Sequence, residues 1–120
     1  MHVWKHGRYV DTWSVVHLLS GMLLGSGLYK LGYGLVWAGL FALFAMLLWE
    51  LFEWVVKISE SLPNIALDIV IGLLGFLLAF CLHAYGGVPF DLASFTALAS
   101  VTALLALWGF TTSLGRGVLE

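Results

Sequence analysis

The fold of this chain is decided by residues 35–56, which read LVWAGLFALFAMLLWELFEWVV. A helix of about 20 apolar residues crosses a bilayer core about 30 Å thick, because each residue adds about 1.5 Å. The segment has this length, and its only charged residues are Glu50 and Glu53, near its end. It therefore predicts a membrane-spanning helix that carries two carboxylates three residues apart.

Apolar stretches of similar length lie on both sides of this segment, at residues 12–31, 65–84 and 92–114. The connectors between the four stretches are short, and they contain turn-forming residues: Gly32, Gly34, Pro63, Gly86, Gly87 and Pro89. Short connectors favour antiparallel neighbours. We therefore expect an all-α fold in which residues 1–120 form a single domain, a four-helix transmembrane bundle.

The composition agrees with a membrane protein and excludes several other classes. Hydrophobic residues make up 62% of the chain and charged residues only 10%, whereas a soluble domain has about 25% charged residues. The net charge of −2 provides no basic surface for phosphate backbones, so we expect no nucleic-acid partner. The single cysteine, Cys81, cannot form an internal disulfide.

The distribution of basic residues predicts the orientation, because cytoplasmic loops carry an excess of Lys and Arg. Only Lys30 falls on one side, whereas four basic residues fall on the side of both termini: Lys5, Arg8, Lys57 and Arg116. We therefore expect a multi-pass protein of the inner, cytoplasmic membrane with both termini in the cytoplasm. Residues 1–11 are interpreted as a basic tail, with a short interfacial helix as the alternative. Several tryptophans are expected in an aromatic belt at the membrane edges: Trp4, Trp13, Trp37, Trp49 and Trp54.

Four ionisable side chains lie well inside the predicted spans on the side of the termini: His17, Glu50, Glu53 and Asp68. Such residues cost about 2.5–3.5 kcal/mol each on insertion scales, and they usually face the interior of a bundle. Counted from the nearest predicted helix end, each lies roughly 6–10 Å deep on the cytoplasmic side. We therefore expect three helices to bring these side chains into one layer near the cytoplasmic leaflet.

Small residues predict which helix faces meet, since they let backbones approach closely in lipid. The first and third spans each carry one such stripe: Ser14, His17, Gly21 and Gly25 in the first, and Asn64, Asp68, Gly72, Gly75 and Ala79 in the third. The fourth span is predicted to be a packing helix on account of its small residues: Ala93, Thr96, Ser100 and Ala103. His83, near the far end of the third span, is interpreted as an interfacial residue.

Three carboxylates close together at low dielectric cannot all stay ionised without a cation. Protonated His17, Lys57 or a bound metal could be that cation. Oxygen ligands with one imidazole suit Mg, Mn or Fe-type divalent ions. The candidate catalytic and metal-ligating residues are His17, Glu50, Glu53 and Asp68, with Ser14, Lys57 and Asn64 in support. A polar staple that joins three helices by hydrogen bonds is the alternative.

Three motifs follow one another along residues 12–80: a histidine four residues before a glycine (His17), an E-x-x-E (Glu50, Glu53) and N-x-x-x-D-x-x-x-G-x-x-G (from Asn64 to Gly75). This order resembles the VanZ-like superfamily of small bacterial and archaeal membrane proteins. The resemblance implies a prokaryotic protein of the cell envelope, since the founding member is linked to glycopeptide resistance. Gly72 departs from that member, in which an asparagine is expected.

The leading functional hypothesis is a membrane-embedded enzyme acting on a lipid-linked or amphipathic substrate of envelope metabolism, with membrane lipids as its partners. Glu50, Glu53 and Asp68 would act as general acid/base or metal ligands, and His17 as a proton carrier or ligand. One alternative is an oligomeric proton- or cation-coupled transporter, and another is an accessory or structural subunit of a larger membrane complex. The substrate, the metal and the oligomeric state are left open.

Overall fold

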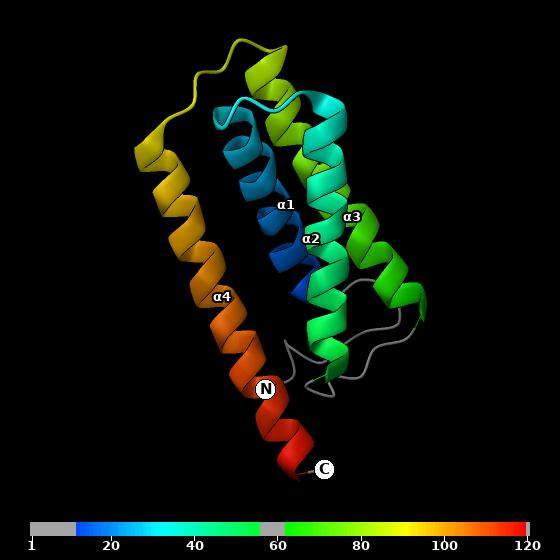
Figure 1. Cartoon of the computed structure of the whole chain (residues 1–120). Coiled ribbons are helices and arrows are strands. Elements are labelled where there is room, and N and C mark those ends of the chain that lie inside the picture. Colours follow the sequence, from blue (N-terminus) through cyan, green and yellow to red (C-terminus); the bar gives the residue numbers. More distant parts are fainter. Residues whose placement is uncertain (1–11, 56–61, 120) are drawn as a thin grey trace.

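The computed structural model describes residues 12–55 and 62–119, and within them the chain forms four helices and no strand. The helices are α1 (Thr12–Lys30), α2 (Leu35–Val55), α3 (Leu62–Ala84) and α4 (Leu92–Leu119). Figure 1 shows them side by side, with the α1–α2 loop and the α3–α4 loop at the same end. The prediction of an all-α fold is confirmed, although α3 begins before and α4 ends after the predicted span.

Three of the described helices are long and apolar enough to cross a membrane. They are Leu35–Val55, Leu62–Ala84 and Leu92–Thr112, with mean hydropathies of 2.1, 2.7 and 1.7. The helix α1 does not belong to this group, and it is the helix that contacts all three others. A helix enclosed by protein can carry His17, serines and glycines, because little of its surface has to face lipid.

The helices α1 and α3 pack most closely, and glycines make this possible. A Cβ atom on Gly21 would collide with the backbone carbonyl of Gly72, and one on Gly75 would collide with the carbonyl of Leu18. Only glycine fits where two backbones approach this closely. All the residues of the two predicted stripes are buried, so the prediction that these faces meet is confirmed.

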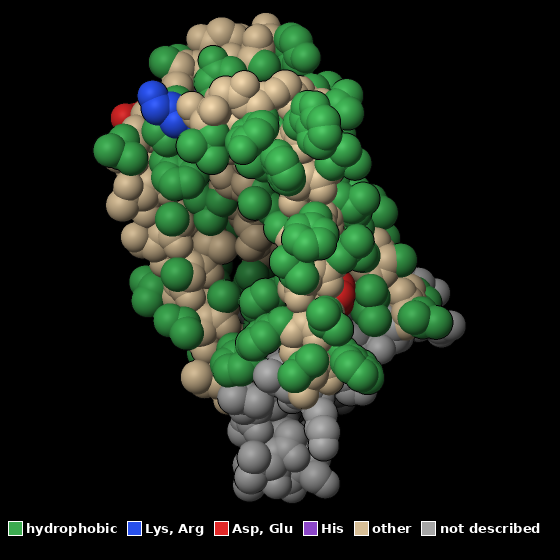
Figure 2. All heavy atoms as spheres, in the orientation of Figure 1, with side chains coloured by type: hydrophobic (Ala, Val, Ile, Leu, Met, Phe, Trp, Pro, Cys, Tyr) green, Lys and Arg blue, Asp and Glu red, His purple; other side chains and the backbone are tan. Residues whose placement is uncertain are grey.

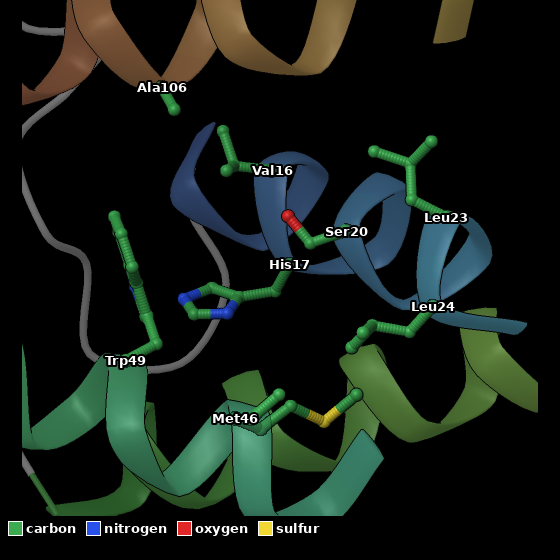
Figure 3. Close-up of a pocket in the computed structure, with 9 residues that line it drawn as sticks. Val16, His17, Ser20, Leu23, Leu24, Met46, Trp49 and Ala106 are labelled. Carbon is green, nitrogen blue, oxygen red and sulfur yellow. The ribbon is translucent and has the colours of Figure 1, made fainter. Parts of the chain in front are cut away.

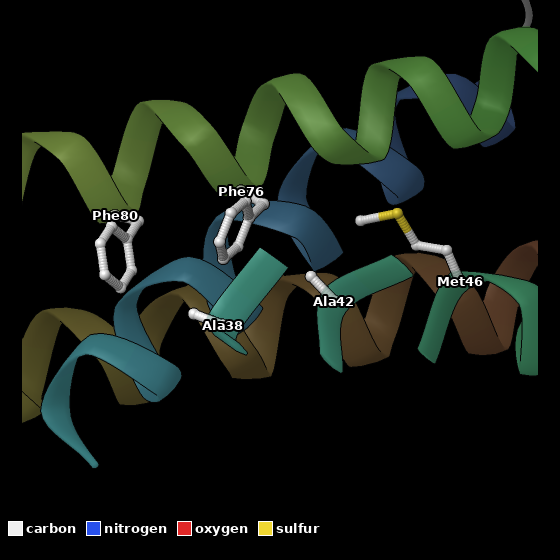
Figure 4. Close-up of a cluster of buried hydrophobic side chains, with 5 residues drawn as sticks. All are labelled: Ala38, Ala42, Met46, Phe76 and Phe80. Atoms are coloured by element: carbon white, nitrogen blue, oxygen red, sulfur yellow. The ribbon is translucent and has the colours of Figure 1, made fainter. Parts of the chain in front are cut away.

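A hydrophobic cluster joins α2 to α3. Figure 4 shows Phe76 and Phe80 pointing from α3 toward Ala38 and Ala42 on α2, with Met46 one turn further along. The two phenylalanine rings stack with their centroids 5.6 Å apart. The alanines let α2 come close to these rings, and the contact fixes how α2 is rotated about its axis.

The helix α4 leans on α1 and makes no backbone contact with α2 or α3 within the described residues. Its contact face contains Thr102, which is buried, and Leu105, Ala106 and Phe110, which pack around Trp13 and Val16 of α1. The small residues noted in the sequence lie away from this contact and are exposed: Ala93, Thr96, Ser100 and Ala103. The side of α4 that faces Trp13 of α1 carries larger apolar side chains instead.

The outer surface of the bundle is apolar. Figure 2 shows hydrophobic side chains over most of the visible face and few charged ones. Large apolar residues are exposed along α2 and α4, among them Val36, Phe44, Trp54, Leu104 and Leu107. Such an extended apolar exterior is rare on soluble monomers and is expected where lipid covers the protein.

Candidate functional site

The four ionisable side chains that the sequence placed in one layer meet around the imidazole of His17. Its Nε2 atom lies 3.3 Å from Oδ2 of Asp68 and 4.0 Å from Oε1 of both Glu50 and Glu53. The histidine comes from α1, the two glutamates from α2 and the aspartate from α3. The predicted convergence of three helices is therefore confirmed, and we call these four residues the acidic cluster.

Local sequence explains how each side chain reaches the acidic cluster. The glycine contacts bring α1 and α3 close enough for the short side chain of Asp68 to meet His17. Residues three apart on a helix are neighbours on its surface, so Glu50 and Glu53 both point to the same side of α2. The contact of Met46 with Gly72 holds that side of α2 against α3.

The acidic cluster is deeply buried. Asp68 is 0% exposed, Glu53 1% and His17 6%. No hydrogen bond from a described residue reaches either carboxylate oxygen of Glu53 or Asp68. A buried ionised group without hydrogen bonds costs several kcal/mol, so protons or a cation must neutralise these carboxylates.

Three members of the acidic cluster are arranged as cation ligands. One ligand atom from each of His17, Glu50 and Asp68 lies within 4.8 Å of the other two. Ligand atoms at this separation suit a central ion, because Mg²⁺ and similar ions bind oxygen or nitrogen at about 2.0–2.4 Å. Glu53 does not belong to this group, so three of the four predicted metal ligands are placed together and the fourth lies beside them.

The supporting residues divide into two groups. Ser14 and Asn64 are buried, at 5% and 0% exposure, about one helical turn from His17 and Asp68 respectively. Lys57 lies outside the described residues, and so do Lys5, Arg8 and the rest of residues 1–11. The basic partner and most of the charges behind the predicted orientation are therefore beyond the described part of the chain.

A largely apolar groove of about 330 Å³ adjoins the acidic cluster between α1, α2 and α4. Figure 3 shows the imidazole of His17 pointing from α1 into this groove, toward Trp49 on α2. The two rings meet edge to face, with centroids 6.4 Å apart. The other lining residues include Val16, Ser20, Leu23, Leu24, Met46 and Ala106. His17 therefore forms a boundary between buried carboxylates and an apolar space.

Apart from His17, the sequence did not predict which residues line the groove, and the expectation for one tryptophan was wrong. Trp13 was expected in the aromatic belt, but it is fully buried and its ring lies 6.3 Å from that of Trp49, which is partly buried. Trp37 and Trp54 are exposed, as a belt requires. Spacing could have signalled the inward position, since Trp13 lies one helical turn before His17.

Comparison of the chain with protein-family models, curated proteins and solved structures gives no match. The function is therefore argued from the acidic cluster and the groove beside it.

Proposed function

We propose that this chain is an integral membrane protein in which His17, Glu50 and Asp68 bind a divalent cation beside a groove for an amphipathic substrate. The observation that carries the proposal is the position of His17. One imidazole lies within 4.0 Å of three carboxylates, two of them buried, and also lines the apolar groove. The function that follows is a membrane-embedded enzyme acting on the headgroup of a lipid-linked or amphipathic molecule.

The proposed topology has four crossings, antiparallel neighbours and both termini in the cytoplasm, which puts the acidic cluster near the cytoplasmic leaflet. Three apolar helices and their enclosure of α1 support the four crossings. Two observations support antiparallel neighbours. The loop of residues 31–34 is short, and the α1–α2 and α3–α4 loops lie at the same end of the bundle. We also propose that the protein belongs to the VanZ-like superfamily and lies in the cell envelope of a prokaryote. This part of the proposal rests on the order in which the motifs follow one another along the chain.

The ligand set favours Mg²⁺ or Mn²⁺, because two carboxylates and one imidazole leave positions for water and substrate oxygens. A divalent cation bound there would polarise a phosphoryl or carbonyl oxygen of the substrate. Glu53 lies outside the ligand group, with its Oε1 atom 4.0 Å from Nε2 of His17, and it would accept a proton from water or substrate at the cation. His17, Glu50 and Asp68 would hold the cation, and the two carboxylates would supply the negative charge.

The groove explains why the substrate should be amphipathic. Its walls are apolar side chains, and it lies where α2 and α4 make no backbone contact. Figure 2 shows a hollow between these helices on a face that is otherwise covered with hydrophobic side chains. An alkyl chain in the groove would direct its polar end toward His17, as substrate sites combine apolar walls with a few placed polar groups.

Manganese binding tests the cation site directly. In purified protein in mild detergent, we expect electron paramagnetic resonance to detect one bound Mn²⁺ per chain. Asp68→Asn and Glu50→Gln should each weaken binding at least about tenfold, because each removes a charged ligand. Asp91→Asn is the matched control, since Asp91 is exposed and lies in the α3–α4 loop, directly before α4. Equal binding by the wild type and both cluster variants, with circular dichroism showing intact helices, would refute the cation site.

Photocrosslinking tests the groove. A fatty acid with a photoreactive group in its chain should crosslink to peptides of α1 and α2 that contain Leu24 or Met46. Ala106→Trp should abolish this crosslink by filling the groove, while Mn²⁺ binding persists. Leu104→Trp is the control, because Leu104 lies on the exposed face of the same helix. A crosslink that survives Ala106→Trp unchanged would place the lipid elsewhere.

A second candidate function, a subunit of an oligomer or of a larger membrane complex, is favoured by one observation. The exposed face of α4 contains four small residues at helical spacing: Ala93, Thr96, Ser100 and Ala103. Faces of small residues are the usual contact surfaces between helices in lipid. Ser100→Leu should then reduce the particle mass measured in mild detergent, and a wild-type protein that is already monomeric would exclude a homo-oligomer.

A further inference from the structure

A second polar arrangement lies far along α1 from the acidic cluster. The Oγ atom of Ser26 is 2.9 Å from Nε2 of His83, and Nδ1 of the same ring is 2.9 Å from the carbonyl oxygen of Val88. Ser26 follows His17 by more than two helical turns, or about 14 Å along α1. The two sites share no residue, so this arrangement needs its own explanation.

The hydrogen bonds define the protonation of the imidazole. A backbone carbonyl can only accept, so Nδ1 must carry the proton that is donated to Val88. In the neutral ring Nε2 is then without a proton and accepts one from the hydroxyl of Ser26. A serine hydroxyl bound to an imidazole whose other nitrogen is held by a third group is the arrangement that activates serine nucleophiles.

Neighbouring groups hold the His83 ring in this position. The ring stacks on Tyr29 of α1, with centroids 5.1 Å apart and planes 17° apart, and it lies 6.2 Å from the ring of Phe90. The carbonyl of Val88 is brought to it by the turn at Gly87, whose φ of 73° favours glycine. A base held from three sides is oriented before any substrate arrives.

Space for a substrate lies directly beside the pair. A cavity of about 210 Å³ is lined by Ser26 and His83 together with the α3–α4 loop and the first turns of α4, including Phe90, Asp91, Ser94 and Leu98. The Nζ atom of Lys30 stands 5.6 Å from the centre of the Phe90 ring. Ser26 is only four residues from the end of α1, so the cavity belongs to the interface between lipid and water.

We propose that Ser26 and His83 form a second, nucleophilic site that takes the acyl group of an ester at the membrane surface. Oγ of Ser26 attacks the ester carbonyl carbon, and its proton passes to Nε2 of His83. The carbon–oxygen bond to the alcohol breaks, and the alcohol leaves with that proton. Water then gives a proton to Nε2 and attacks the acyl-serine, which releases the carboxylic acid and restores the hydroxyl.

A hydrogen bond between Ser26 and His83 that only joins α1 to α3 would have the same contacts. The reactivity of the Ser26 hydroxyl distinguishes this structural role from a nucleophilic one. A long-chain alkyl fluorophosphonate is a suitable probe in mild detergent. Oγ forms a bond to phosphorus, fluoride leaves and the serine proton passes to Nε2. Peptide mass spectrometry of the wild-type protein should find the label on Ser26. Ser94 is an internal control, because it lines the same cavity but bonds to the carboxylate of Asp91.

Substitutions then assign the roles within the pair. Ser26→Ala should abolish the label, and His83→Gln should slow labelling at least about tenfold, because the amide offers hydrogen bonds but does not accept a proton. Ser100→Ala should have no effect, since its hydroxyl donates to the Thr96 carbonyl on the exposed side of α4. Folded wild-type protein without label on Ser26, equal labelling of Ser26 and Ser94, or a His83→Gln variant as fast as the wild type would each overturn the proposal. None of these results changes the expected Mn²⁺ binding at the acidic cluster.

Discussion

Glu53 and Asp68 are the residues whose burial most needs an explanation. Each is at most 1% exposed, and neither accepts a hydrogen bond from the described part of the chain. Replacing a buried ionic group by a neutral one of similar shape often leaves a protein equally or more stable. The burial of these carboxylates therefore agrees with the proposed cation binding and proton transfer at the cluster.

Glu53→Gln should stabilise the cation-free protein, because it removes one of three carboxylates that crowd a single imidazole. The expected gain is about 1–3 kcal/mol, measured by thermal unfolding in detergent with a chelator present. Saturating Mn²⁺ should stabilise the wild type and the variant alike, by about 2.7 kcal/mol at a concentration one hundred times the dissociation constant, because Glu53 lies outside the ligand group. A Glu53→Gln variant that is less stable under chelation would show that Glu53 is a structural element of the fold.

Asp91 is a residue whose acid response follows from its contacts. The hydroxyl of Ser94 and, next, its backbone N–H donate to this carboxylate at the start of α4, and they lower the pKa of Asp91 from its ordinary value. A lowered pKa stabilises the folded state above the unfolded value near pH 4, and this contribution is lost as the pH falls through the folded pKa. Ser94→Ala should therefore raise the pKa of Asp91. As the pH is lowered, the first turn of α4 should then begin to fray at a higher pH than in the wild type. Carboxyl titration by NMR and hydrogen exchange in the first turn of α4 measure both effects, and an unchanged titration would contradict the assignment.

The pairing of α1 with α3 depends on glycines that leave no room for a side chain. Gly75→Ala would place a methyl group against the carbonyl of Leu18, the residue next to His17. We expect a loss of about 1–3 kcal/mol in thermal stability and weaker Mn²⁺ binding, because the helices must separate. Gly27→Ala is the matched control on α1, since its methyl group would meet only the Phe95 ring at an ordinary 3.7 Å. Equal effects of the two substitutions would argue against a close backbone contact.

The helices differ in how far the sequence could predict their packing. Gly21 and Gly72 lie in stripes with polar residues, and the structure confirms those faces because close approach in lipid needs small side chains. On α4 the small residues do not mark the covered face, since Ser100 is exposed and the helix turns a bulkier face toward Trp13. Periodicity shows that a face exists, but the shape of the neighbouring helix decides which face is covered.

The whole molecule adds features that no single helix predicts. Convergence of the acidic cluster could be predicted, because depth in a membrane follows from the number of residues to a helix end. The groove could not be predicted, since it exists only where α4 leans on α1 and makes no backbone contact with α2 in the described part of the chain. The contact between Ser26 and His83 likewise depends on the register of α1 against α3, which hydropathy does not encode.

The orientation of the molecule in its membrane is the last prediction. In a variant whose native cysteine is removed (Cys81→Ser), Leu31→Cys and Tyr85→Cys should react with a membrane-impermeant maleimide in intact cells. Both positions are exposed, at 73% and 71%, and both loops lie at one end of the bundle, which the charge distribution places outside. Leu62→Cys, 81% exposed at the start of α3, should react only after the cells are permeabilised. If only Leu62→Cys reacted in intact cells, the orientation would be opposite to the predicted one, and the acidic cluster would lie near the outer leaflet. A difference between Leu31→Cys and Tyr85→Cys would mean that the connecting loops lie on opposite sides and that the four-crossing topology is wrong.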